Sequence, residues 1–253
     1  MAVLNRVSEF YDEMVEWRRD FHENPELEFD VHRTAAVVEA KLKAFGCDEV
    51  VTGIGRTGVV GIIKGRGAGS KVIGLRSDMD ALPMEEHTGL PYASNTPGKM
   101  HACGHDGHMA MLLGAAKYLA ETRNFDGSVA VIFQPAEEQG GGGEVMVQDG
   151  MMDRFGIDEV YGMHNAPDIP VGQFSTAPGP LLASTDEYTV LIKGYGGHGA
   201  RPQRAVDPTI IAANIVTAAQ SVATRNADPL EQMVVSITSF KTESDTVNVI
   251  PGT

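Results

Sequence analysis

Residues 129–138 read Val-Ala-Val-Ile-Phe-Gln-Pro-Ala-Glu-Glu, an apolar run that leads through a proline into two adjacent glutamates. A short apolar run rich in β-branched residues predicts a buried strand. Similar runs predict further strands, and apolar residues at helical spacing predict helices. The strands are expected at 58–63, 72–75 and 159–163, and the helices at 3–22, 33–45 and 107–121. Strands that alternate with helices predict an α/β fold, with a mostly parallel sheet flanked by helices.

The pattern changes beyond the Pro-Gly-Pro sequence at residues 178–180. There we expect a strand, a helix and two more strands, at residues 187–193, 208–224, 233–240 and from Thr246 onward. This β-α-β-β order predicts a smaller α+β domain, a split βαβ or ferredoxin-like sandwich that is incomplete at Thr253. We therefore expect two domains, at residues 1–181 and 182–253.

The composition is that of an ordinary globular protein, with 42% hydrophobic and 21% charged residues among 253. A formal net charge of −14 argues against a nucleic-acid partner, because no basic stripe is present to meet phosphates. No apolar run reaches membrane-spanning length, the N-terminus lacks a signal-peptide pattern, and two cysteines do not suggest a disulfide framework. We therefore expect a cytoplasmic protein without a membrane partner.

The densest chemistry lies at residues 100–108, which read Met-His-Ala-Cys-Gly-His-Asp-Gly-His. Three imidazoles, a thiol and a carboxylate would each need a partner if they were buried. Metal binding satisfies such groups together, since thiolate and imidazole are favoured ligands of zinc and similar divalent ions. The segment therefore predicts a metal site just ahead of a helix that Asp106 is placed to cap.

Polar side chains also follow three of the predicted strands: Asp78 and Asp80, Glu137 and Glu138, and His164. In open α/β sheets, ligands gather at the carboxyl ends of the strands. We therefore expect these side chains to meet Cys103 and His105 in one pocket, with an aspartate free to orient a ligand histidine.

Each of these features has a simpler explanation when it is taken alone. Adjacent glutamates are commonly a solvated surface pair, aspartates commonly form turns, and a single histidine is commonly structural. The occurrence of all these polar side chains after predicted strands favours a functional site over these simpler explanations. The glycine-rich sequence at residues 194–199 has the spelling of a dinucleotide-binding loop, but Arg201 and Pro202 follow where a helix is needed.

At these residues the sequence resembles the M20 family of metallopeptidases. It is most similar to the M20D amidohydrolases, which include hippurate hydrolases, N-acyl-amino-acid amidohydrolases and auxin-conjugate hydrolases. The similar segments run through the chain in order, at residues 18–22 with 25–27, 76–83, 100–108, 134–138, 162–165, 196–200 and 248–251.

The resemblance implies a Zn-exopeptidase-like catalytic domain and a lid domain that also forms a homodimer. It implies two divalent metal ions per subunit (Mn, Zn, Ni or Co), with ligands Cys103, His105, Glu138 and His164. It further implies Glu137 as general base, Asp80 as a supporting acidic residue, His198 as a group reaching the partner's active site, and Asn248 as a substrate contact. Members of the family continue beyond the position of Thr253, where a further histidine ligand is expected.

The implied reaction is hydrolysis of the N-acyl amide bond of a hippurate-like N-acylated amino acid, by a metal-activated water. A serine mechanism is disfavoured, because the chain has no Gly-x-Ser-x-Gly sequence. Two alternatives stay open. Cys103, beside histidines, could act as a nucleophile and form an acyl-enzyme. The chain could also be a metal-binding or peptide-binding protein of the same fold that has lost turnover.

Overall fold

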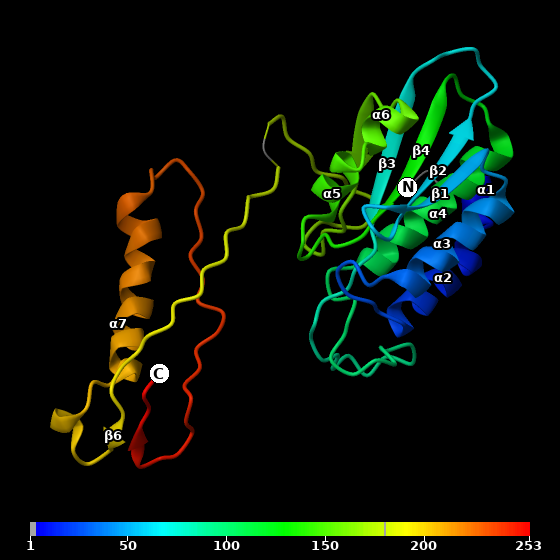
Figure 1. Ribbon diagram of the computed structural model, residues 1–253. Coiled ribbons are helices and arrows are strands. Elements are labelled where there is room, and N and C mark those ends of the chain that lie inside the picture. The colour runs from blue at the N-terminus through cyan, green and yellow to red at the C-terminus, as the bar shows by residue number, and fades with distance from the viewer. Residues whose placement is uncertain (1–3, 180) are drawn as a thin grey trace. The chain divides into compact units, whose positions relative to one another are not determined.

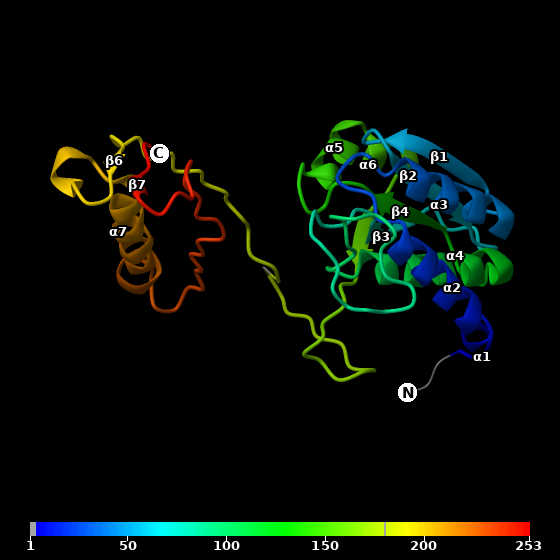
Figure 2. The ribbon, with the colours of Figure 1, turned by 90° about the horizontal axis from the view of Figure 1, so that it is seen from below.

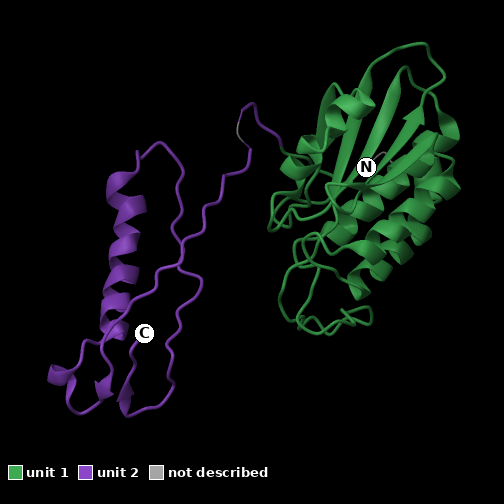
Figure 3. Cartoon of the chain, in the orientation of Figure 1, with its two compact units in different colours: residues 1–175 green, residues 176–253 purple. Residues whose placement is uncertain are grey.

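The computed structural model describes residues 4–179 and 181–253. The chain divides into two compact units, Met1–Ser175 and Thr176–Thr253 (Figure 3). The prediction of a catalytic domain at residues 1–181 and a lid domain at 182–253 stays a prediction. None of the helices in the described ranges is both long enough and apolar enough to cross a membrane.

The first unit is built on a five-stranded sheet, whose strands lie in the order β1-β2-β4-β3-β5 (Figures 1 and 2). The strands are β1 (Glu49–Ile54), β2 (Gly58–Lys64), β3 (Val72–Asp78), β4 (Ser128–Gln134) and β5 (Glu159–Gly162). The apolar run that predicted a buried strand is β4, which lies at the centre of the sheet.

The α/β class and the flanking helices are confirmed, whereas the sheet is mixed rather than mostly parallel. Strand β3 pairs in parallel with β4 and β5, but β2 is antiparallel to both β1 and β4. Only residues 55–57 separate β1 from β2, and so short a connection closes a hairpin, because a parallel pair needs a crossover of a dozen or more residues. The sequence pattern had missed β1, and with it this hairpin.

Helices cover both faces of the sheet, and β2 shows how the faces differ. Val59 and Ile63 pack with the helices of one face, α2 (Tyr11–Glu23), α3 (His32–Phe45) and α4 (His105–Thr122). Val60 and Ile62 point the other way and pack toward α5 (Gly142–Gln148) and α6 (Met151–Phe155). The alternation follows from the two-residue period of a strand. A short helix, α1 (Asn5–Ser8), precedes α2.

Helix α4 begins directly after the segment that carries Cys103. Its N-cap is Gly104, whose φ of 90° lies in the left-handed region that favours glycine. The prediction that Asp106 caps the helix was therefore wrong, because the helix starts earlier, at His105. Asp106 lies instead in the first turn, where its Oδ2 accepts hydrogen bonds from Arg18 and His22.

The second unit contains a long helix and a short two-stranded sheet. Helix α7 (Pro208–Ser221) confirms the predicted helix, and β6 (Gly197–His198) pairs antiparallel with β7 (Val249–Ile250). A 3₁₀ turn (Pro202–Arg204) precedes α7 and a π-helical turn (Val222–Asn226) follows it.

The strands predicted at residues 187–193 and 233–240 are not formed, so the expected β-α-β-β sandwich is only partly present. Tyr188 and Val234 are each 86% exposed, so among the described residues no apolar layer covers them to offset the entropy of ordering these segments.

Buried His22, near the end of α2, joins three parts of the first unit. Its Nδ1 lies 2.8 Å from Oδ2 of Asp106 on α4, and its Nε2 lies 3.3 Å from Oε1 of Glu86 in the loop between β3 and α4. The hydrogen bond to Asp106 is the main cause that raises the pKa of His22, and Glu86 adds to it. The segment that leads into α4 is thereby fixed to α2.

We predict that the contribution of His22 to stability falls as the pH rises. In the folded state His22 keeps its proton above its ordinary pKa of 6.5, whereas the unfolded chain loses it there. The gap in unfolding free energy between the wild type and His22→Gln should be largest below about pH 6 and should shrink toward pH 9. Urea titrations across this range measure the gap. A gap that is constant with pH would show that His22 does not change its charge with folding.

We also predict that Leu113→Ala lowers the unfolding free energy by about 2–5 kcal/mol, because Leu113 is fully buried between α4 and the sheet. Met111→Ala, at an exposed position of the same helix, should cost less than about 1 kcal/mol. Equal losses in chemical denaturation would contradict the assignment of this face of α4 to the core.

Candidate metal centre

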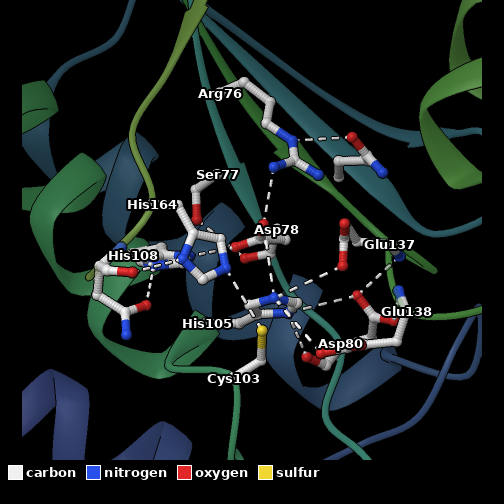
Figure 4. Close-up of polar contacts among 12 residues, drawn as sticks. Arg76, Ser77, Asp78, Asp80, Cys103, His105, His108, Glu137, Glu138 and His164 are labelled. Atoms are coloured by element: carbon white, nitrogen blue, oxygen red, sulfur yellow. Dashed lines mark hydrogen bonds and ion pairs between the residues drawn. The ribbon is translucent and has the colours of Figure 1, made fainter. Parts of the chain in front are cut away.

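The candidate centre lies at the carboxyl ends of β3, β4 and β5, beside the start of α4 (Figure 4). The structure brings together the predicted site residues of the first unit: Asp80, Cys103, His105, Glu137, Glu138 and His164. They come from segments far apart in the sequence, as the strand-end argument required.

His105, the first residue of α4, lies at the middle of the group and is fully buried. Its Nδ1 donates to the backbone oxygen of Asp80 at 2.7 Å, which leaves Nε2 with a lone pair. Nε2 lies 3.7 Å from Oε2 of Glu137 and 3.7 Å from Oε1 of Glu138. Neither His105 Nε2 nor Glu138 Oε1 has a hydrogen-bond partner among the described residues. A cation between them would satisfy both, so the donors fit a metal ion.

Cys103 and His164 place a sulfur and a nitrogen atom at the same centre. Sγ of Cys103 lies 3.4 Å from Nε2 of His164, and Nδ1 of His164 donates to the backbone oxygen of Asn165 at 2.7 Å. Burial raises the pKa of the Cys103 thiol to about 12, and the charge of Glu138 adds to the effect. Without a cation the thiol is neutral and a poor nucleophile at neutral pH, whereas a coordinating thiol is deprotonated.

The turn after β4 fixes the two glutamates through Asp80. Oδ1 of Asp80 accepts from the backbone N–H of Glu137 at 2.9 Å, and Oδ2 accepts from that of Glu138 at 3.0 Å. Ala136 enters this turn with a φ of 51°, and its N–H donates to the backbone oxygen of Glu28 at 2.9 Å. Both carboxylate oxygens of Asp80 therefore hold the turn that carries the two glutamates.

Within the described part of the chain, three sets of His, Cys, Asp or Glu side chains have ligand atoms within 4.8 Å of one another. All three sets contain His105, and two of them, Cys103–His105–His164 and His105–Glu137–Glu138, together contain all four predicted ligands. Thiolate, imidazole and carboxylate donors together suit a first-row divalent ion. The third set is Asp78–His105–His108, and no sequence pattern gives His108 a role of its own. The spacing of three residues between His105 and His108 could have placed them on one side of a helix.

The remaining predicted residues, His198 and Asn248, belong to the second unit. Pairing of β6 with β7 brings them together, and His198 Nε2 lies 3.3 Å from Asn248 Nδ2. The exposed setting predicted for His198 is present. The expected approach of His198 to the metal centre of a partner subunit stays a prediction.

Known proteins share this sequence and fold. Residues 74–249 match Peptidase family M20/M25/M40. The chain is 46% identical over 251 residues to a hippurate hydrolase of Campylobacter jejuni, and the match covers 99% of this chain and 64% of that protein. It is 42% identical over 243 residues to an N-acetylcysteine deacetylase of Bacillus subtilis, covering 96% and 63%. The chain therefore spans less than two thirds of the length of these curated relatives.

A solved structure of the M20 family is also similar to this chain. The crystal structure of a dinuclear metal-binding peptidase of the M20 family from Bacillus subtilis matches 85% of this chain and 57% of its own, with a TM-score of 0.66 and 36% identity. The sequence match, the fold and the side chains of the candidate metal centre agree, and the chain belongs to peptidase family M20/M25/M40.

Proposed function

We propose that this protein is a metal-dependent amidohydrolase that cleaves the N-acyl amide bond of hippurate-like N-acylated amino acids. The observation that carries the proposal is the buried Nε2 of His105, which lacks a partner among the described residues and lies between a thiol and two carboxylates. The names of the relatives support the substrate class, because hippurate and N-acetylcysteine are both N-acylated amino acids.

Four residues would hold two divalent ions, Mn, Zn, Ni or Co: Cys103, His105, Glu138 and His164. Bound there, the ions would polarise the scissile carbonyl and lower the pKa of a water molecule. Asp80 keeps Glu138 in place through the backbone of the turn, and its backbone oxygen orients His105.

Glu137 is the residue that we propose as general base and then general acid. Its side chain is 39% exposed, against 18% for Glu138, so Glu137 is the more accessible of the two to a substrate and a water. It would take a proton from the attacking water and deliver it to the leaving nitrogen, as one carboxylate can do both in turn. The neighbouring glutamates therefore have different roles because the turn points them into different surroundings.

We further propose a cytoplasmic homodimer in which the second unit completes the site. His198 would stabilise the oxyanion in the partner's site, and Asn248 would contact the substrate. Their proximity within the second unit supports a shared role. Both cysteines are free, which suits a reducing compartment.

Hydrolysis of hippurate by the chain loaded with Mn²⁺ tests the proposal. We predict that Glu137→Gln lowers kcat by roughly 10²–10⁴-fold, because it removes the proton-transfer group, and keeps the bound metal. Glu144→Gln, on the exposed surface of α5, is the matched control and should leave kcat unchanged. Equal rates for the wild type and Glu137→Gln, or two bound metal ions without hydrolysis, would favour the non-catalytic alternative.

We predict that chelation abolishes hydrolysis, that Mn²⁺ restores it, and that mild thiol alkylation of the metal-loaded chain leaves it intact. The reason is that the Cys103 sulfur would then be a metal ligand rather than a free nucleophile. Rates before and after treatment with a chelator or iodoacetamide decide the point. Activity that survives chelation and is lost on alkylation would support the acyl-enzyme route instead.

A further inference from the structure

Asp78 and His108 are buried beside the candidate centre, yet the proposed chemistry gives them no part. Oδ1 of Asp78 lies 2.7 Å from Nδ1 of His108, and Oδ2 accepts from Nη1 of Arg76 at 2.7 Å. Nε of Arg76 donates in turn to Oε1 of Gln134 at 2.9 Å. The imidazole of His108 is therefore tied, through a buried carboxylate, to the ends of β3 and β4 (Figure 4).

The other nitrogen of His108 reaches the segment that follows β5. With the proton of His108 on Nδ1, facing Asp78, the backbone N–H of Asn165 donates to Nε2 at 3.0 Å; Oδ1 of Asn165 lies 2.6 Å from the same nitrogen and would accept from it only if Nε2 carried the proton. Asn165 is exposed and lies outside any helix or strand. A buried side chain of α4 thus fixes an exposed residue of an irregular segment.

The close packing of Asn165 against Gly104 is a second observation that fixes the position of Asn165. An ideal Cβ on Gly104 would lie 2.6 Å from Oδ1 and 2.9 Å from Cγ of Asn165. The amide of Asn165 therefore occupies the space that a side chain at position 104 would fill. Only a glycine lets it lie so close to the segment between Cys103 and His105.

Asn165 in turn sets the orientation of His164. Its backbone oxygen accepts from Nδ1 of His164 at 2.7 Å, so the lone pair of that imidazole is on Nε2, which faces the sulfur of Cys103. The His164 ring also meets the His108 ring edge to face, with centroids 4.6 Å apart. A hydrogen bond to the second nitrogen is how proteins fix the tautomer and orientation of a metal-binding histidine.

We propose that Asp78 and His108 are positioning residues that hold His164 in its ligand orientation through Asn165. The proposal rests on the proposed function, which makes His164 a metal ligand. His108 is not itself a ligand, although it falls in a set with Asp78 and His105, because Asp78 and Asn165 occupy both of its ring nitrogens.

The test uses two variants of the 253-residue chain and Co²⁺ as the metal probe. His108→Phe keeps a ring against His164 but removes both nitrogens, and Asn165→Pro removes the backbone donor at an exposed position. Each should weaken Co²⁺ binding by roughly 10–100-fold. His87→Phe, at an exposed histidine of the loop before α4, is the matched control and should bind as the wild type does.

A second measurement separates positioning from a general structural effect. In the metal-free wild type, ¹⁵N NMR should show the His164 ring as a single tautomer with its proton on Nδ1, and both variants should show a mixture. Wild-type Co²⁺ affinity and a single tautomer in both variants would overturn the proposal and leave the proposed function intact. If the wild type itself failed to bind Co²⁺, the proposed function would fail, and the His164 tautomer would still decide whether His108 fixes that ring.

Discussion

One buried imidazole nitrogen, Nε2 of His105, decides what the candidate metal centre can hold. A buried polar atom without a hydrogen-bond partner costs about 1–3 kcal/mol, and among the described residues neither this nitrogen nor the Glu138 carboxylate oxygen that faces it has one. A divalent cation removes both costs at once. The candidate ligands come from the ends of three strands and from the start of a helix. A bound ion would hold together these segments, which the fold brings near each other.

Three aspartates near the centre hold other groups in position and are not themselves proposed as metal ligands. Asp80 holds the turn with Glu137 and Glu138, Asp106 holds His22, and Asp78 holds His108. Burial opposes ionisation of Asp78, but the hydrogen bond from His108 and the charges of His105 and Arg76 keep its pKa low, at about 2. Such a carboxylate stays charged in the folded protein and gives strong, directed hydrogen bonds. The rigidity of the centre therefore comes from residues that need not touch a substrate.

Sequence patterns located the centre because it depends on periodicity and chain order. Glu137 and Glu138 follow the apolar run of β4, and His164 follows the end of β5. In an α/β sheet, polar groups in such positions lie at the same edge. Strand β1 could not be predicted, because it is an edge strand whose residues are mostly half-buried or exposed. Its pattern of apolar residues is therefore weak. The contact of His108 with Asn165 joins α4 to a segment 57 residues later, which no local pattern specifies. The strands expected at residues 187–193 and 233–240 are not formed, because an apolar pattern forms a strand only where another layer covers it.

The central claim is that Cys103, His105, Glu138 and His164 share divalent cations in one pocket. X-ray absorption at the zinc edge of the Zn²⁺-loaded chain tests it most directly. The account predicts a sulfur neighbour at about 2.3 Å together with nitrogen and oxygen neighbours at about 2.0–2.2 Å, and loss of the sulfur shell alone in Cys103→Ser. A spectrum with only oxygen and nitrogen neighbours in the wild type would contradict it.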